Sequence, residues 1–462
     1  MHIKPNKCLF TVKRVTDICL FFLFACVPLI VNPFAYDCWY KPKINSVYAL
    51  IIIILIAIGI RNLLFNSPLR FRSIPVLIPL IAYAGSAIIS TIFSISPRLS
   101  LAGDMYRQEG LFAILSYVSL TFLFSQLVES EKQIQSLVKG LFISALIISI
   151  YGIMNYNGYY PIKQLVPNPE QKGLGLGSLI GNANFLGKFL VLIMPLSIAY
   201  YLTAINEARK YFYGAVFMLC LFSLIVTFTR ASWLSFIVGL VIFAFIIGRE
   251  IFRNNMRKIL VSVLVICFIA GISFYALLLH GESKENIFDI VKKRIYSSFD
   301  LEKGIGITTR LFVWKRTIGL IQERPLVGYG PDTHVKAMSK LNLEYGLEFN
   351  EWVLREEWGK KILRFNKWTV LDRAHNNYLD ITIGQGLIGL VTYLSIILAF
   401  LVWLRRIIKQ EEDISKRTIY CGIFAAFCGC LINDFFIFSV VSVSPTFWSL
   451  MGITFAMKNV RT

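Results

Sequence analysis

The sequence predicts an all-α polytopic membrane protein with about 12 transmembrane helices and one large structured extracytoplasmic loop. Composition is the first reason: 56% of the 462 residues are hydrophobic and only 16% are charged, which excludes a soluble domain of this length. The second reason is a series of apolar segments long enough to cross a hydrocarbon core of about 30 Å. The third is that the basic residues of the short loops fall mainly on one side of these segments.

Twelve apolar segments are the predicted spans, and the segment at 45–60 is short. Only Thr229-Arg230 separates two of these segments, so either a helical hairpin or one long helix fits there. A single helix of roughly 37 residues would exceed the thickness of a normal bilayer. The predicted spans are 16–31, 45–60, 74–93, 111–128, 137–155, 184–204, 212–228, 231–248, 259–279, 376–403, 418–434 and 440–457.

Orientation follows from the basic residues, which mark the cytoplasmic side of membrane proteins. With the N-terminus inside, the short inner segments hold 22 Lys and Arg residues and the short outer loops hold seven. We therefore expect a multi-pass protein of the cytoplasmic membrane with both termini in the cytoplasm. The net charge of +20 is mainly a topology signal that also suits anionic lipid headgroups, and it requires no nucleic acid partner.

The spans divide the chain into three predicted parts. Residues 1–279 form a membrane bundle with spans 1 to 9, residues 280–373 form a partly helical extracytoplasmic loop, and residues 374–462 form spans 10 to 12. The first apolar run lacks a small-residue cleavage site, so we expect it to remain as a helix. The nine cysteines lie mostly inside spans and predict packing residues, with no disulfide or zinc framework.

The large loop contains one clear helical pattern, from Thr309 to about Glu323. A 3-4-3 apolar stripe and a following Arg-Pro pair predict its face and its end. Arg310 would then lie in the first turn, where a cation opposes the helix dipole unless a bound anion offsets it. An ordinary surface arginine is the alternative. The stripe consists of Leu311, Trp314, Ile318 and Ile321.

Two further arginines lie in short predicted outer loops, against the charge bias of such loops. Arg230 falls in the tight turn between two spans, where a snorkelling side chain is the ordinary explanation. Arg107 has Asp104 and Glu109 close by in sequence as structural partners. Both are candidates for binding an anionic substrate, and Arg107 ranks below Arg230.

His375 precedes the predicted span 376–403. The dipole of a helix N-terminus lowers the pKa of an imidazole, which suits a general base near neutral pH; an interfacial histidine that only binds backbone is the alternative. His334 is a spare candidate. Asn182 and Asn184 begin span 184–204 after several glycines, which is compatible with sugar or phosphate binding, although simple helix capping explains them as well.

Taken in order, these motifs resemble the O-antigen ligase and polymerase family. The matching topology and the large loop before the histidine extend the resemblance over most of the chain; one departure is Ala183, where many relatives have proline. The motifs are GNANFLG at 181–187, TRASW at 229–233, Arg310 with Trp314, RPLVGYG at 324–330, AHNNYL at 374–379, GLIG at 386–389 and, as in some members, YRQEGL at 106–111.

The resemblance implies an inverting glycosyltransferase, without metal or other cofactor, whose donor is a glycan on undecaprenyl diphosphate. Arg230 and Arg310 would bind the diphosphate, and His375 would take the proton from the acceptor hydroxyl. Arg107, Asn182 and Asn184 would have supporting roles. The acceptor is a glycan, a lipid or a protein, and we favour ligase-like transfer only slightly over polymerisation of lipid-linked repeat units.

The alternative from another class is a transporter or flippase for an anionic or lipid-linked solute. Such a protein would place ionisable residues and broken helices near the bilayer midplane. The candidate acids Asp380 and Asp434 lie near the ends of predicted spans, so transfer is favoured. A purely structural scaffold would leave Arg230, Arg310 and His375 without a role.

Overall fold

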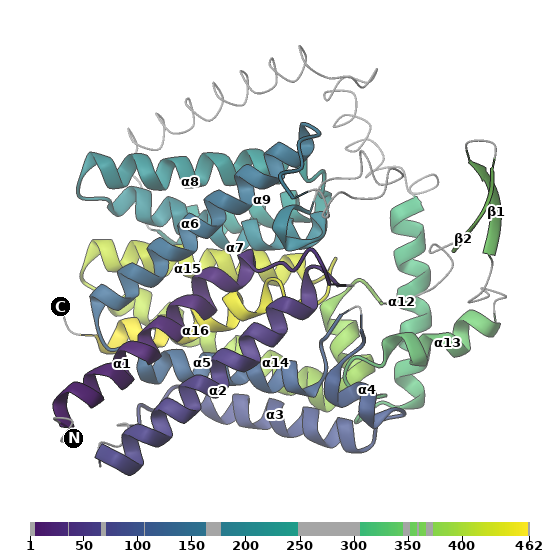
Figure 1. Cartoon of the computed structure of the whole chain (residues 1–462), viewed down its shortest axis with the longest axis horizontal. Coiled ribbons are helices and arrows are strands. Elements are labelled where there is room, and N and C mark those ends of the chain that lie inside the picture. The colour runs from purple at the N-terminus through teal and green to yellow at the C-terminus, as the bar shows by residue number, and fades with distance from the viewer. Residues whose placement is uncertain are drawn as a thin grey trace.

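The computed structural model is a bundle of helices packed along one direction, with shorter helices and a β-hairpin at one end (Figure 1). It describes residues 5–35, 37–65, 71–105, 107–162, 177–247, 305–344, 352–357, 360–365 and 373–460. The predicted span at 259–279 lies outside these residues. The α-helices of the bundle are α1 (Pro5–Phe21), α2 (Tyr40–Phe65), α3 (Leu77–Ile92), α5 (Leu111–Leu127), α6 (Glu131–Tyr156), α7 (Ala183–Thr203), α8 (Glu207–Val226), α9 (Arg230–Ile246), α14 (Asn377–Gln410), α15 (Ile414–Asn433) and α16 (Ser444–Asn459).

Six of these helices are long and apolar enough to cross a membrane: α2, α6, α7, α8, α14 and α15. The multi-pass character predicted from composition is therefore confirmed, whereas the count of about 12 spans is not. Helices α3, α5 and α9 are apolar but shorter. The question left open at Arg230 is answered, because α8 ends at Val226 and α9 begins at Arg230 as two separate helices.

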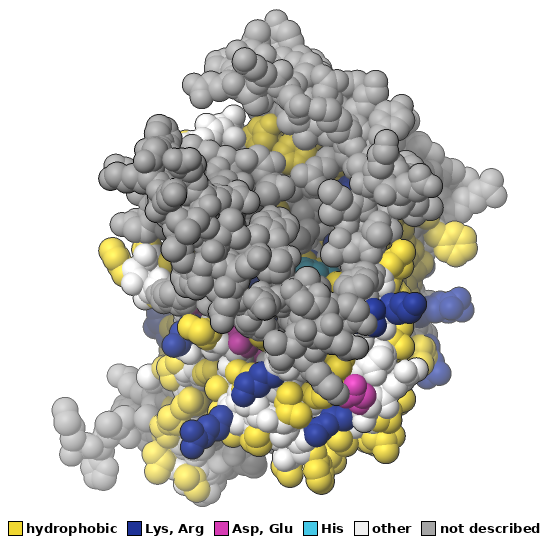
Figure 2. Space-filling view, turned by 90° about the vertical axis from the view of Figure 1, so that its right-hand side faces the viewer, with side chains coloured by type: hydrophobic (Ala, Val, Ile, Leu, Met, Phe, Trp, Pro, Cys, Tyr) yellow, Lys and Arg dark blue, Asp and Glu magenta, His cyan; other side chains and the backbone are white. Residues whose placement is uncertain are grey.

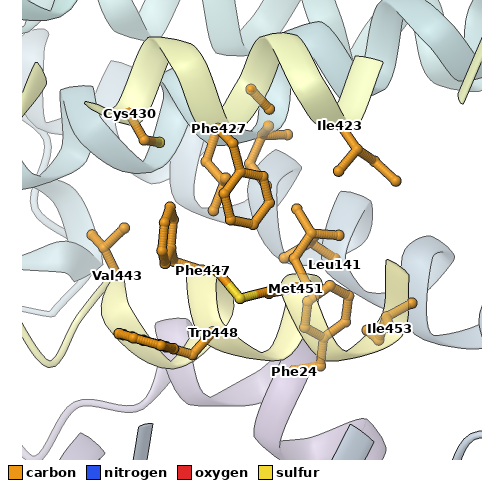
Figure 3. Close-up of a cluster of buried hydrophobic side chains, with 14 of the residues drawn as sticks. Phe24, Leu141, Ile423, Phe427, Cys430, Val443, Phe447, Trp448, Met451 and Ile453 are labelled. Atoms are coloured by element: carbon orange, nitrogen blue, oxygen red, sulfur yellow. The ribbon is translucent and has the colours of Figure 1, made fainter. Parts of the chain in front are cut away.

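Aromatic and aliphatic side chains of α15 and α16 form the centre of the bundle (Figure 3). The rings of Phe427 and Phe447 lie 4.5 Å apart, centroid to centroid. Phe24 contributes from a short π-helical turn, η1 (Phe22–Cys26), and Leu141 from α6. Because lipid is as apolar as these side chains, close van der Waals packing fixes the two C-terminal helices among the earlier ones.

Segments predicted to share the inner side of the membrane contact one another. Lys13 Nζ lies 2.7 Å from Glu129 Oε2, and Arg72 Nη1 donates to the carbonyl of Val128 over 2.9 Å. The start of α1 and the end of α16 lie at the same end of the bundle (Figure 1). This agrees with termini on one side, and the assignment of that side to the cytoplasm stays a prediction.

The opposite end carries α4 (Pro97–Ala102), α12 (Ile305–Glu323), α13 (His334–Glu344) and a hairpin of β1 (Trp352–Glu357) and β2 (Lys360–Phe365) (Figure 1). The strands pair antiparallel, with Trp352 opposite Phe365, and are the β structure of an otherwise helical chain within the described ranges. The predicted helix of the large loop is thus observed, and it ends at Glu323 as expected.

Two details of that loop helix were predicted wrongly. Helix α12 begins at Ile305, so Arg310 lies in its second turn and the argument from the first turn does not hold. The buried face carries Val313, Thr317 and Leu320, whereas Leu311 and Ile318 of the predicted stripe are exposed. The periodicity was correct and the face was correct in part, since Trp314 and Ile321 of the stripe are partly buried against the cluster that contains Val313 and Leu320. Helix α12 packs against α13 and α14, and a periodic pattern alone does not say which stripe meets a neighbour.

Helix α14 is broken at Gly386, which has a φ of 69° that an L side chain rarely adopts. A Cβ at this position would lie 2.0 Å from the carbonyl oxygen of Leu326. Residues 325–330 fill the break: the N–H groups of Tyr329 and Gly330 donate to the carbonyls of Ile383 and Gly384, each over 2.8 Å. The RPLVGYG and GLIG motifs therefore meet in the fold.

The break divides α14 into two parts with different surroundings. Residues 380–386 are all buried, whereas exposed apolar side chains begin at Leu387 and continue along the helix to Val402. Residues 387–410 alone span about 36 Å at 1.5 Å each. The predicted span at 376–403 coincides with the larger part of α14, which is long and apolar enough to cross a membrane.

Candidate active site

The predicted site residues gather around the loop between α15 and α16, residues 434–443, which we call the α15–α16 loop. The ring of Phe438 in this loop is 2% exposed. The guanidinium carbons of Arg107 and Arg373 lie 4.9 Å and 5.4 Å from its centroid. The imidazole of His375 lies 5.5 Å away, centroid to centroid. One aromatic ring thus contacts two cations and a histidine.

Asn182 and Asn184 lie at the start of α7, just before Phe185. The Asn182 side chain caps α7 by accepting the N–H of Asn184 over 2.9 Å, so the capping explanation is confirmed for Asn182; Asn184 itself is exposed. The following Phe185 stacks edge to face on Phe438 at 5.5 Å. The absence of a side chain at Gly187 lets α7 approach the TRASW turn, since a Cβ there would lie 2.3 Å from Ser232 Oγ.

Arg230 and Arg310 come together from distant parts of the chain. Arg230 is the first residue of α9, and Arg310 lies in α12. Burial lowers the pKa of Arg310, and the nearby positive charge of Arg230 lowers it further. The guanidinium of Arg310 also lies 5.8 Å from the ring centroid of Phe436, in the α15–α16 loop. Both side chains are partly buried, so two like charges share a place shielded from water.

Several of these residues adopt or adjoin strained backbone. His375 has a φ of 50°, Gln108 beside Arg107 has 59°, and Phe228, two residues before Arg230, has 53°. Each such conformation in a residue other than glycine costs about 1–3 kcal/mol and is frequent at functional sites. The chain therefore bears a conformational cost at three separate segments that carry predicted site residues.

An ion pair lies beneath the ring of Phe438, between buried Arg373 and Asp332. The second carboxylate oxygen of Asp332 accepts the N–H groups of Asp104, over 2.6 Å, and Glu109, over 2.9 Å. Asp332 therefore fixes both ends of the segment that carries Arg107. Because an ion pair buried in this way loses its hydration, both partners are needed to keep it stable.

His334, the spare candidate, belongs to this buried network. Arg373 Nη1 lies 2.8 Å from His334 Nδ1, and since arginine can only donate, Nδ1 accepts. The other ring nitrogen then donates to the carbonyl of Asp380 over 2.8 Å. Burial and the charge of Arg373 lower the pKa of His334 well below its usual value. With both nitrogens engaged, His334 is not placed to accept a proton from a substrate.

A second buried ion pair joins Lys188 of α7 to Asp434 at the start of the α15–α16 loop. Asn377 donates its backbone N–H to the carbonyl of Asp434 over 2.7 Å. The two ion pairs line a cavity of about 70 Å³, which Glu109, Tyr83 and other polar side chains also line. Such a polar cavity has room for a few water molecules.

Glu109 connects this cavity to the α15–α16 loop. It is buried, and its carboxylate accepts the hydroxyl groups of Tyr117 over 2.8 Å and Ser439 over 2.9 Å. Burial raises the pKa of Glu109 to about 7. Its carboxylate thus accepts hydrogen bonds from Ser439 and Tyr117, whereas its position in the sequence indicates Arg107 as a partner.

Figure 2 views this end of the molecule, where several Lys and Arg side chains lie among hydrophobic ones on the described surface. The buried charges lie close to this end as well. Lys188 is the sixth residue of α7 and Asp380 the fourth of α14, so both lie within about 8 Å of a helix end. This placement differs from the midplane position that a transporter would require.

Three features of the site were missed in the sequence analysis: the aromatic pair Phe436 and Phe438, the arginine at 373, and the acid at 332. Arg373 lies two residues before His375, and Asp332 directly follows the GYGP turn. A charged residue this close in sequence to a motif could have been predicted as a site candidate. Nothing in the local sequence marks the Phe-rich loop, because its importance depends on which distant side chains it contacts.

Comparison with known proteins agrees with these motifs. Residues 215–394 match the model of the family described as O-antigen ligase. A protein of Rickettsia conorii named "Putative polysaccharide ligase" is 25% identical over 258 residues, which are 54% of this chain and 51% of its own length. A protein of the same name from Rickettsia felis is 25% identical over 247 residues, 52% and 48% of the two chains.

The chain spans about half the length of the curated relatives that it matches. The family segment at 215–394 includes the TRASW, RPLVGYG, AHNNYL and GLIG motifs as well as Arg230, Arg310 and His375. The resemblance predicted from the ordered motifs is confirmed over this segment, which is similar to the O-antigen ligases.

Proposed function

We propose that the protein is an inverting glycosyltransferase, independent of metal, that moves a glycan from undecaprenyl diphosphate to an acceptor at the outer face of the cytoplasmic membrane. The observation that carries this proposal is the pair of arginines, Arg230 and Arg310, held together at the end of the bundle that also holds His375. The similarity of residues 215–394 to O-antigen ligases supports it.

The arginine pair suits a diphosphate. Two guanidinium groups that share a partly buried place repel each other, and an anion with several oxygens between them converts this repulsion into attraction. The leaving diphosphate gains negative charge as its bond to the sugar breaks, so Arg230 and Arg310 stabilise the transition state more than the ground state. Arg107, on the neighbouring face of the site, contributes positive charge towards the donor.

His375 is the proposed general base. As the acceptor hydroxyl oxygen attacks the anomeric carbon, its proton passes to a nitrogen of His375, and the bond from that carbon to the diphosphate oxygen breaks with both electrons leaving on the diphosphate. Attack opposite the leaving group inverts the anomeric configuration. The diphosphate is a good leaving group, so the step needs no paired carboxylic acids of the glycosidase type.

The position of the site at one end of the bundle fits a lipid-linked donor. A polyprenyl tail can stay among the helices while its diphosphate reaches Arg230 and Arg310. For the acceptor, we favour ligase-like transfer over polymerisation of repeat units. The relatives named as polysaccharide ligases support that preference, and the acceptor is a glycan, a lipid or a protein.

Transport of an anionic or lipid-linked solute is the competing function. The buried ion pairs and the break in α14 are features that transporters share. Lys188 and Asp380 lie near helix ends, and residues 325–330 occupy the break in α14. These positions favour a fixed site at the membrane surface over an alternating pathway through it.

The test is release of undecaprenyl diphosphate by the purified protein in nanodiscs, supplied with lipid-linked glycan and an acceptor and treated with a metal chelator. We expect release by the wild type and a loss of about 10²–10⁴-fold in kcat for His375→Ala, the usual contribution of a general base. Lys336→Ala, which removes an exposed cation near the same end, is the control and should keep full activity.

Two results would contradict the proposal. Unchanged release by His375→Ala would remove this histidine from the mechanism. Movement of intact lipid-linked glycan across the membrane of proteoliposomes, with no release of diphosphate, would instead identify a transporter.

A further inference from the structure

We infer that Phe438 is a positioning residue for the transfer reaction: its ring holds the general base and a donor-side arginine at a fixed separation. This inference rests on the proposed function. His375 and Arg107 come from segments more than 260 residues apart in the sequence, and both contact the ring of Phe438. The ring therefore contacts both His375 and Arg107, which in the proposed reaction act on the same donor and acceptor.

The contacts of the ring are directional. An aromatic face attracts a guanidinium, and each such contact is worth about 0.5–2 kcal/mol depending on exposure. The ring contacts Arg107 at 4.9 Å and Arg373 at 5.4 Å, and the imidazole of His375 at 5.5 Å. An aliphatic side chain of the same volume would fill the space but would not attract either cation.

The ring itself is held firmly by the residue that follows it. The N–H of Ser439 donates to Asn377 Oδ1 over 3.0 Å, and its hydroxyl donates to Glu109 over 2.9 Å. On another side, Phe185 packs edge to face against the ring. These contacts come from α7, from α14 and from the segment before α5, so the position of Phe438 is fixed by three parts of the bundle.

A rigid contact at Phe438 is needed because the backbone around His375, the proposed base, is strained. His375 has a φ of 50° and precedes Asn376, the cap of α14. Gln108, next to Arg107, has a φ of 59°. Strained positions of this kind persist only where the surroundings impose them. A displacement of about 1 Å at a catalytic group can reduce the rate roughly 100-fold, so a rigid contact for both side chains has a large effect on the rate.

The test compares Phe438→Leu with Phe427→Leu. Both substitutions remove a fully buried aromatic ring, but Phe427 packs against Phe400 and Phe447 in the core and serves as the matched control for lost packing. For Phe438→Leu, we expect kcat to fall about 10- to 100-fold. The KM for the lipid-linked donor should change by less than about threefold, because Arg230 and Arg310 bind the diphosphate.

A spectroscopic measurement gives a second readout that needs no turnover. The chain has four histidines, so the imidazole resonances of protein labelled at histidine can be assigned with His375→Gln. Phe438→Leu should move the His375 resonances, because the ring current of Phe438 is lost. Phe427→Leu should leave them in place.

Equal losses of kcat in the two leucine variants would overturn the inference, and so would a rise in donor KM with unchanged kcat. If Phe438→Leu does not fold, Ser439→Ala decides: it frees the loop from Glu109 and should lower kcat severalfold with the donor KM preserved, whereas full kcat would overturn the inference. Failure of the proposed function looks different, since the wild type would then release no undecaprenyl diphosphate at all.

Discussion

The buried ion pairs and the arginine pair are two ways in which this fold keeps charge away from water. In the ion pairs, Arg373 faces Asp332 and Lys188 faces Asp434, with each cation in contact with a carboxylate. In the arginine pair, Arg230 and Arg310 bring like charges together, and the pKa of Arg310 is lowered by burial and by its neighbour. The ion pairs stabilise the fold around the site, and we propose that the arginine pair binds an anion.

The difference leads to opposite expectations for neutral substitutions. Removing one partner of a buried ion pair leaves an uncompensated charge and costs stability. Removing one of two adjacent like charges relieves repulsion. We therefore expect no loss of stability in the protein without a bound anion. The Tm of each variant without ligand therefore distinguishes residues that stabilise the fold from residues that we propose bind the substrate.

The largest effect is expected for Asp332→Asn. It leaves Arg373 buried without its carboxylate and weakens the acceptor for the N–H groups of Asp104 and Glu109, so we expect a loss of about 3–5 kcal/mol. Thermal unfolding in detergent should show a Tm well below that of the wild type. Glu207→Gln, which removes the carboxylate of an exposed ion pair with Lys210, is the matched control and should leave the Tm unchanged. If Asp332→Asn has the same Tm as the wild type, the ion pair between Arg373 and Asp332 does not stabilise the fold.

An intermediate, pH-dependent effect is expected for Glu109→Gln. Burial raises the pKa of Glu109 from 4.5 to about 7, so the folded protein favours the protonated carboxyl. The corresponding contribution to stability is full below about pH 4.5 and is lost as the pH rises through about 7. The variant should therefore gain Tm relative to the wild type between pH 5 and pH 8. An equal difference in Tm between variant and wild type at pH 5 and pH 8 would show that Glu109 does not titrate in this range.

The smallest effect on the ligand-free protein is expected for Arg310→Gln. Because this substitution removes one of two adjacent cations, the Tm without ligand should equal or slightly exceed that of the wild type, in contrast to Asp332→Asn. The same thermal unfolding measurement at low ionic strength checks this, since repulsion between charges is strongest when salt does not screen it.

Much of the fold follows from local sequence, because composition and hydrophobic run length report directly on burial in a bilayer. All predicted spans inside the described residues overlap helices of the bundle, and the end of α12 follows from its Arg-Pro pair. The break at Gly386 could not be predicted in the same way. Its cause is the distant segment 325–330, which satisfies the backbone groups that the break leaves open.

The site was predictable where a residue was unusual for its own surroundings. Arg230 conflicts with the charge bias of outer loops, and His375 precedes a span; both lie in the end of the bundle that gathers the site. Arg373 and Asp332 look like ordinary charges of a polar loop until the fold buries them together. Phe438 looks like one more hydrophobic residue in a chain that has 37 phenylalanines, so only its contacts reveal a role.

The most direct test of the arginine pair is the binding of undecaprenyl diphosphate, measured as the increase in Tm with ligand concentration, for the wild type and Arg310→Gln. We predict that the ligand raises the Tm of the wild type by an amount that grows with its concentration, and that Arg310→Gln has an unchanged Tm without ligand and little increase with it. A variant that is destabilised without ligand and still shows the full increase would contradict the assignment of this pair to the diphosphate.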